Sequence, residues 1–160
     1  MQSINSPFVF ALPASHVPES IPTTVYRVHR PSAQTKYSFA SGFRSKNQTT
    51  ILNQLSMLNN FALAHLHGQT NISSPFISVY DDQAHAERMA IYLSNKFGEE
   101  MTVVAVDTRH FARGPVFRAA DLLGGKDVEM AATDSEIHRG EYLIMYKIPP
   151  QAIRTETAVG

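Results

Sequence analysis

Alternation of apolar and polar residues predicts strands near the start and the middle of the chain. Residues 23–30, TTVYRVHR, alternate β-branched and aromatic residues with polar ones until Pro31 ends the run. This pattern predicts a strand that carries Arg27 on the same face as Val25. Residues 101–108, MTVVAVDT, are apolar on both faces over much of their length, which predicts a central strand.

Two further strands are predicted beside prolines. The segment SPFISVY has the pattern of a short strand and places Phe76, Ser78 and Tyr80 on one of its faces. The segment EYLIMYKI begins at Glu141 and stops before Pro149, so we expect one continuous strand there. A carboxylate therefore opens this strand directly after a loop.

Apolar residues recur at steps of three and four in the segments that we expect to be helices. One helix is expected between Thr49 and His67. A second is expected to begin at a cap formed by Asp81 or Asp82 and to end at Gly98, because glycine readily adopts the left-handed conformation that closes a helix. The later segment VFRAADLLGG predicts a short third helix.

The other segments are irregular. Residues 1–21 contain several prolines among small polar residues and are expected to form an arm that leads into a single domain, residues 22–160. Residues 126–140 are mostly polar and predict a loop before the last strand. Early helices, strands throughout and no strict alternation between them predict an α+β domain with a mainly antiparallel or split sheet and flanking helices.

Composition and charge narrow the classes of function. The chain has 160 residues, of which 43% are hydrophobic, and this is enough for one core. Its 14 basic and 14 acidic side chains cancel, so we expect no general attraction to nucleic acid. The chain has no cysteine, which excludes disulfides and thiolate ligands for a metal.

Targeting signals are weak along the sequence. The opening residues lack the basic and apolar regions of a signal peptide, and no run approaches the ~18 apolar residues of a membrane span. We therefore expect no membrane partner. The expected location is the cytoplasm, or a host cell into which the protein is delivered.

Several polar residues stand out on the predicted elements. The guanidinium of Arg27, in mid-strand, is expected to meet an anionic ligand, to form a structural salt bridge or to lie on an exposed edge. Ser78 would enter the core unless its hydroxyl finds a partner, and Glu141 alone is equally consistent with a solvated strand end. His65 and His67 are two residues apart, a poor spacing for joint metal binding, so no metal site is expected. Phosphate-binding loops, dinucleotide turns and serine-hydrolase motifs are missing from the sequence.

Four short motifs occur in an order that is typical of one enzyme family. VYRVHR supplies a strand arginine, Arg27, and HLHG supplies a histidine after a helix, His65. SPFISVY supplies the aromatic residue Phe76 and the serine Ser78, and GEYLIMYKIPPQAI supplies a glutamate, Glu141, that leads a strand ending in Ile-Pro. Together they resemble the pertussis-toxin and cholera-toxin class of ADP-ribosyltransferases, and more closely a group of uncharacterised fungal domains of this type.

The resemblance implies a compact ADP-ribosyltransferase-like fold that uses NAD⁺ as a substrate. Glu141 would be the catalytic carboxylate that stabilises the oxocarbenium-like ribose, held in position by Ser78, while Arg27 braces the dinucleotide. The expected NAD⁺ contacts are Arg27, His65, Phe76, Ser78 and Tyr80.

The implied function is mono-ADP-ribosylation of a protein, in an effector or toxin. Members of the family that modify arginine have a second glutamate two residues before the catalytic one, whereas this chain has Arg139 there, so we do not expect arginine to be the acceptor. Tyr80 and Arg139 also motivate an alternative, a catalytically silent binding module that acts through its surface. Hydrolysis of NAD⁺ and modification of nucleic acid are further alternatives.

Overall fold

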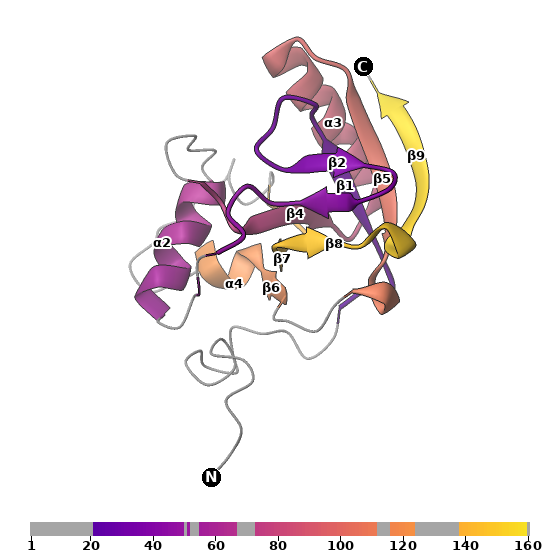
Figure 1. The fold of residues 1–160 in the computed structure, drawn as a ribbon. Coiled ribbons are helices and arrows are strands. Elements are labelled where there is room, and N and C mark those ends of the chain that lie inside the picture. Colours follow the sequence, from indigo (N-terminus) through magenta and orange to yellow (C-terminus); the bar gives the residue numbers. More distant parts are fainter. Residues whose placement is uncertain are drawn as a thin grey trace.

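The structure is a computed structural model of the 160-residue chain. It describes residues 21–49, 51, 55–66, 73–111, 116–123 and 138–159 (Figure 1). The arm expected at residues 1–21 therefore lies outside the described residues apart from Ile21, as does most of the expected loop at residues 126–140. Within the described ranges, no helix has the length and apolar character needed to cross a membrane.

Two antiparallel sheets form the body of the molecule. The larger sheet has the order β6 (Val116–Arg118), β7 (Glu141–Met145), β4 (Phe76–Tyr80), β1 (Thr24–His29), β5 (Met101–Asp107), β9 (Ile153–Val159). The smaller sheet has the order β2 (Lys36–Ser38), β3 (Gly42–Arg44), β8 (Lys147–Ile148). The helices are α2 (Leu55–Leu66), α3 (Gln83–Phe97) and α4 (Ala119–Leu123), with short 3₁₀ turns at Thr108–His110 and Pro150–Ala152. The predicted α+β class with split, mainly antiparallel sheets is confirmed.

The elements with the clearest periodicity form where the sequence predicts them. Strands β1 and β5 occupy the two predicted segments, and α2 lies inside the first predicted helix. Helix α3 begins after Asp82, whose carboxylate accepts a hydrogen bond from the backbone N–H of His85 at 3.1 Å. It ends at Gly98, which is left-handed with φ of 66°.

One predicted helix is partly a strand. Within the segment VFRAADLLGG, Ala119–Leu123 form the helix α4, whereas the first three residues form β6 and pair with β7, Phe117 opposite Leu143. The local pattern could not show this, because the backbone partner that makes these residues extended lies more than twenty positions along the chain.

The last predicted strand is divided between the two sheets. Strand β7 pairs with β4 in the larger sheet, and β8 pairs with β3 in the smaller one. Between them Tyr146 has φ of 67°, a left-handed conformation that breaks the strand. The carbonyl of Tyr146 accepts hydrogen bonds from the backbone N–H of Ser45 and from Gln48 Nε2, each at 2.8 Å, so contacts with a distant loop hold the break. β2, β3 and β9 were not predicted.

The larger sheet is covered on both faces. The smaller sheet packs on one face through a cluster that contains Phe43 and Ile148. The opposite face carries two separate apolar clusters, one beneath α2 and α4 and one beneath α3, which lie on different sides of the molecule in Figure 1. Between these two clusters the same face carries Ser78 and Glu141, with His65 of α2 bonded to Ser78; these three residues are called the polar strip below.

The sheet opens along one line. Strand β1 is in register with β5 at every position from Thr24 to His29, but with β4 only at Tyr26, opposite Tyr80. Beyond that pair the two strands diverge, so the backbone groups of β4 that would face β1 lose their partners in the ladder. Arg27, the next residue of β1, lies at the point of divergence.

Candidate active site

Arg27 places a buried guanidinium at the opening between β1 and β4. Its Nη1 donates a hydrogen bond to the backbone carbonyl of Ser78 at 3.1 Å, which replaces a missing ladder bond, and its Cζ lies 5.8 Å from the centroid of the Phe43 ring. The buried Nε has no hydrogen-bond partner among the described residues. Burial lowers the pKa of Arg27 to about 10, opposed by the charge of Glu141, so the side chain remains cationic at neutral pH.

His65 links two serines through its ring nitrogens. It lies in the last turn of α2, and its Nδ1 is 2.6 Å from Ser74 Oγ while its Nε2 is 2.6 Å from Ser78 Oγ. Ser74 Oγ also accepts a hydrogen bond from the backbone N–H of Phe76 at 3.0 Å. Burial lowers the pKa of His65 to about 4, so the ring is neutral at pH 7, with one nitrogen donating and the other accepting.

Glu141 is a buried carboxylate held by a turn. Only 4% of the residue is exposed, and Oε1 lies 2.5 Å from Nδ1 of His138. The turn before β7 brings these residues together: the backbone N–H of Glu141 donates to the carbonyl of His138 at 3.2 Å, and Gly140 is left-handed with φ of 67°. The backbone N–H of Asp81 donates to the carbonyl of Gly140 at 2.9 Å, which ties the turn to the end of β4.

The structure gives Ser78 a different partner from the expected one. Its hydroxyl bonds to His65, the carboxylate of Glu141 bonds to His138, and no hydrogen bond joins Ser78 to Glu141 among the residues described. Ser78 lies opposite Leu143, and Glu141 lies opposite Tyr80, so the two side chains share a face as diagonal neighbours. Diagonal neighbours are about 7–8 Å apart between Cα atoms, which leaves room for a ligand hydroxyl between them.

Phe76 and Tyr80 lie beneath the site. The ring of Phe76 is completely buried and makes edge contacts with His65 and Phe117, at centroid distances of 5.9 and 6.2 Å. Tyr80 is 7% exposed and packs on His85 at 5.3 Å under α3. The structure therefore shows both expected contact residues supporting the polar strip, with their rings turned into apolar clusters.

Two residues of this arrangement were not singled out in the sequence. His138 and Ser74 each bond directly to a predicted site residue, Glu141 and His65 respectively. The local sequence His138-Arg139-Gly140-Glu141, with a glycine between the histidine and the glutamate, could have indicated the contact between His138 and Glu141. Nothing in the sequence around Ser74 indicates its contact with His65, because that partner comes from α2.

The match to a known family covers most of the chain. A family described as Domain of unknown function (DUF7587) matches residues 20–160. The chain belongs to this family. Its DUF7587 region includes every described strand and helix. None of the curated proteins is a significant match to the chain.

The fold is also found among solved structures. The structure of EcPltA matches this chain at 17% sequence identity and a TM-score of 0.55, over 86% of this chain and 75% of that one. At this identity the likeness shows a shared fold. The mixed α/β structure of the DUF7587 domain, with mostly antiparallel sheets and few helices, is a compact ADP-ribosyltransferase-like fold.

Proposed function

We propose that the protein is an NAD⁺-dependent mono-ADP-ribosyltransferase. The observation that carries this proposal is the buried guanidinium of Arg27, whose Nε lacks a partner in the part of the chain that the structure describes. Burial lowers the pKa of this guanidinium, and the charge of the buried Glu141 opposes that effect. A buried cation that is only partly bonded is costly unless an anion completes its shell. The phosphates of a dinucleotide would do so, and the fold shared with EcPltA is consistent with this substrate.

The residues of the polar strip suit the chemistry of glycosyl transfer. When the bond between the ribose C1′ and nicotinamide breaks, the bonding electrons leave with nicotinamide and positive charge develops on the ribose. Glu141 would accept a hydrogen bond from the ribose 2′-hydroxyl and stabilise that charge. The neutral His65 orients the Ser78 hydroxyl toward the same region. The acceptor then bonds to C1′ and loses a proton.

The acceptor is proposed to be a protein side chain other than arginine. Arg139 is exposed in the turn that precedes Glu141, at the position from which an acidic residue would otherwise assist an incoming guanidinium. Arg139 supplies no carboxylate at this position, so an arginine acceptor would lack the acidic partner that the arginine-modifying enzymes offer. Action as an effector or toxin belongs to the same proposal.

Release of nicotinamide from NAD⁺ tests the proposal. Wild-type protein should release nicotinamide and transfer labelled ADP-ribose to a protein in a cell lysate, and Glu141→Gln should reduce both rates by roughly 10²–10³-fold, the range for loss of a group that stabilises transition-state charge. Glu100→Gln removes an exposed carboxylate beside β5 and should leave both rates unchanged. Equal rates for wild type and Glu141→Gln would refute the proposed transferase activity.

A catalytically silent binding module is the second candidate. It is favoured by Tyr80, which stands where the ADP-ribosyltransferases that this chain resembles have the last serine of a Ser-Thr-Ser strand and which turns its ring under α3, and by Arg139. Titration with NAD⁺ separates the two functions, because a silent module would show no binding at millimolar NAD⁺. Release of nicotinamide without labelling of any protein would instead identify an NAD⁺ glycohydrolase.

A further inference from the structure

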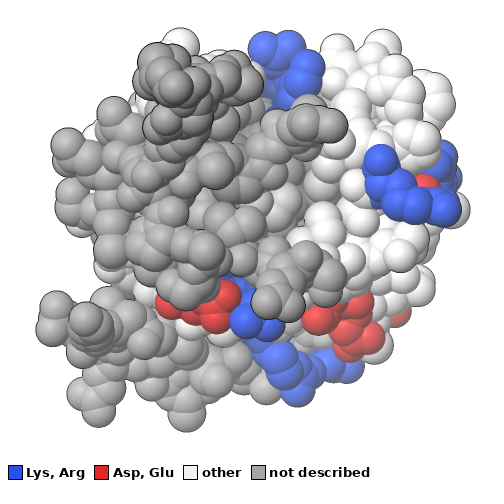
Figure 2. Space-filling model, turned by 90° about the horizontal axis from the view of Figure 1, so that it is seen from below, with Lys and Arg blue, Asp and Glu red and all other residues white. Residues whose placement is uncertain are grey.

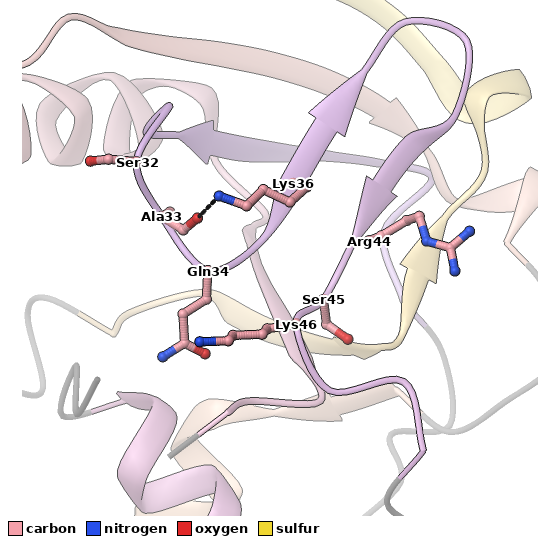
Figure 3. A pocket seen from close by; sticks show the side chains of 7 residues that line it. All are labelled: Ser32, Ala33, Gln34, Lys36, Arg44, Ser45 and Lys46. Atoms are coloured by element: carbon pink, nitrogen blue, oxygen red, sulfur yellow. Dashed lines mark hydrogen bonds between the residues drawn. The ribbon is translucent and has the colours of Figure 1, made fainter. Parts of the chain in front are cut away.

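A basic cavity lies between the β1–β2 connection and β3. Its volume is about 540 Å³, and it is lined by Ser32, Ala33, Gln34, Lys36, Arg44, Ser45 and Lys46. In Figure 3, Lys46 extends alongside Gln34 and Lys36 bends back to the carbonyl of Ala33, whereas Arg44 extends away toward β8. Three of the seven lining residues are cations and none is acidic.

The cations of the smaller sheet occupy directly opposite positions and have no acidic partners among the described residues. Lys36 is directly opposite Arg44 in the ladder of the smaller sheet, and Arg44 is directly opposite Lys147. Like charges in directly opposite positions destabilise a sheet. Among the residues described, no ion pair involves Lys36, Arg44 or Lys46, and the hydrogen bond of Lys36 to Ala33 is made to a backbone carbonyl.

Charges are arranged differently elsewhere on the protein. The guanidinium groups of Arg30, Arg118 and Arg154 each pair with a carboxylate. On the face seen from below, basic and acidic residues lie in small interspersed groups (Figure 2). Glu99 bonds to Ser32 Oγ of the cavity lining at 2.5 Å, but it is already paired with Arg30. An external anion is therefore the natural complement of the two lysines.

The cavity adjoins the candidate active site through one hydrogen-bonded chain. Gln34 lines the cavity, and its Oε1 accepts a hydrogen bond from the backbone N–H of Ser74 at 2.9 Å. The hydroxyl of Ser74 bonds to His65, which in turn bonds to Ser78. A single extended ligand could thus contact Ser78 and Glu141 at one end and the lysines at the other.

We infer that this cavity binds the phosphate of the adenylate half of NAD⁺, with Lys46 and Lys36 as donors, while the other phosphate of the pyrophosphate lies toward Arg27. The inference rests on the proposed function, which requires the nicotinamide ribose to lie at Glu141. Ammonium groups form charge-assisted hydrogen bonds with phosphate oxygens, and these are among the stronger polar contacts in proteins. The zero net charge of the chain is consistent with such a site, because the positive charge is local.

Binding by isothermal titration calorimetry tests the inference, with NAD⁺, ADP-ribose and AMP as probes. Lys46→Ala should weaken binding of all three about 10-fold, in line with loss of one charge-assisted hydrogen bond. Lys36→Ala should likewise weaken binding of NAD⁺, ADP-ribose and AMP. Lys147→Ala is the matched control, because it removes a cation from the same row that does not line the cavity, and it should change the affinities less than 2-fold.

The outcomes separate this inference from the proposed function. If the wild type binds NAD⁺ and both lysine variants bind it as tightly as Lys147→Ala does, the inference is overturned while the transferase stands. If inorganic pyrophosphate competes with AMP in the wild type but not in Lys46→Ala, the phosphate contact is supported. If the affinities change as expected but Glu141→Gln releases nicotinamide at the wild-type rate, the transferase is refuted and the phosphate site remains.

Discussion

At the scale of single residues, the buried polar groups explain why the core is not uniformly apolar. Arg27 and Glu141 are 8% and 4% exposed, yet both lie where apolar side chains would be more stabilising. Each has a partner that holds its orientation, Ser78 for the guanidinium and His138 for the carboxylate. The sequence indicated the position of Arg27 because it interrupts an apolar strand, whereas the contact with His138 depends on a turn.

His65 should make stability depend on pH. Its pKa in the folded protein is about 4 because of burial, whereas the ordinary value is 6.5. Between these values the unfolded chain binds a proton that the folded protein does not, so the free energy of unfolding should fall as pH is lowered through this window, by at most about 1.4 kcal/mol per pH unit. His29, whose pKa burial also lowers to about 4, acts in the same direction.

Urea unfolding at pH 7, 6 and 5 measures this dependence. In His65→Asn the free energy of unfolding should change less steeply with pH than in the wild type. The difference between the two slopes should correspond to at most one proton bound on unfolding. Substitution of the exposed His110 by Asn controls for loss of a histidine at the surface. Identical slopes for the wild type and His65→Asn would contradict a buried, neutral His65.

At the scale of elements, the turn before β7 determines where the carboxylate lies. Gly140 and Gly98 both have left-handed backbones, with φ of 67° and 66°. A Cβ at Gly98 would meet nothing within 4 Å, whereas a Cβ at Gly140 would lie 2.1 Å from Oδ1 of Asp81. The two glycines are therefore required for different reasons, backbone conformation alone at Gly98 and close approach as well at Gly140.

Substitution of each glycine by alanine separates the requirement for a left-handed backbone from the requirement for close approach. Gly98→Ala should lower the free energy of unfolding by about 1 kcal/mol, the cost of a left-handed non-glycine residue. Gly140→Ala should cost more, because Asp81 must also move, and displacement of Glu141 by about 1 Å should slow nicotinamide release about 100-fold. Chemical denaturation and the release assay measure the two effects. Equal stability losses with full activity in Gly140→Ala would show that the turn does not position Glu141.

At the scale of the whole molecule, the divergence of β1 from β4 leaves the sheet incomplete at the site. The opening exposes the Ser78 carbonyl to Arg27 and separates the clusters beneath α2 and α3. A ligand bound across this opening would contact both halves of the core. Binding should therefore stabilise the entire fold and not a single loop.

Thermal unfolding with NAD⁺ tests this expectation. At about 100 times its Kd, NAD⁺ should add ~2.7 kcal/mol to the free energy of unfolding and raise the Tm by roughly 5–11 °C for a chain of this size. Arg27→Met should remove that rise and should lower the Tm without NAD⁺, since the Ser78 carbonyl loses the guanidinium that bonds to it. Arg88→Met, on the exposed face of α3, should retain the full rise. The same rise in Arg27→Met and wild type would exclude the guanidinium from the binding site.

The strands and helices that the sequence predicted correctly are those with a clear periodicity of apolar residues over neighbouring positions. The alternation around Arg27 and the stripe that ends at Gly98 identified β1 and α3, because side-chain periodicity follows directly from backbone geometry. Strand β9 was missed because most of its residues are exposed, so no buried apolar stripe marks it in the sequence. The short strands of the smaller sheet were missed because two or three residues carry too little periodicity.

The sequence by itself determined the α+β class and the main strands and helices, since these follow from the periodicity of nearby residues, whereas the residues of the polar strip were expected only from the family resemblance. Only the tertiary structure decided that Tyr146 sends one predicted strand into two sheets, and that Ser78 bonds to His65 while Glu141 bonds to His138. It also decided that the two lysines beside Gln34 share a cavity. These outcomes depend on distances between segments far apart in the chain, which no local pattern encodes.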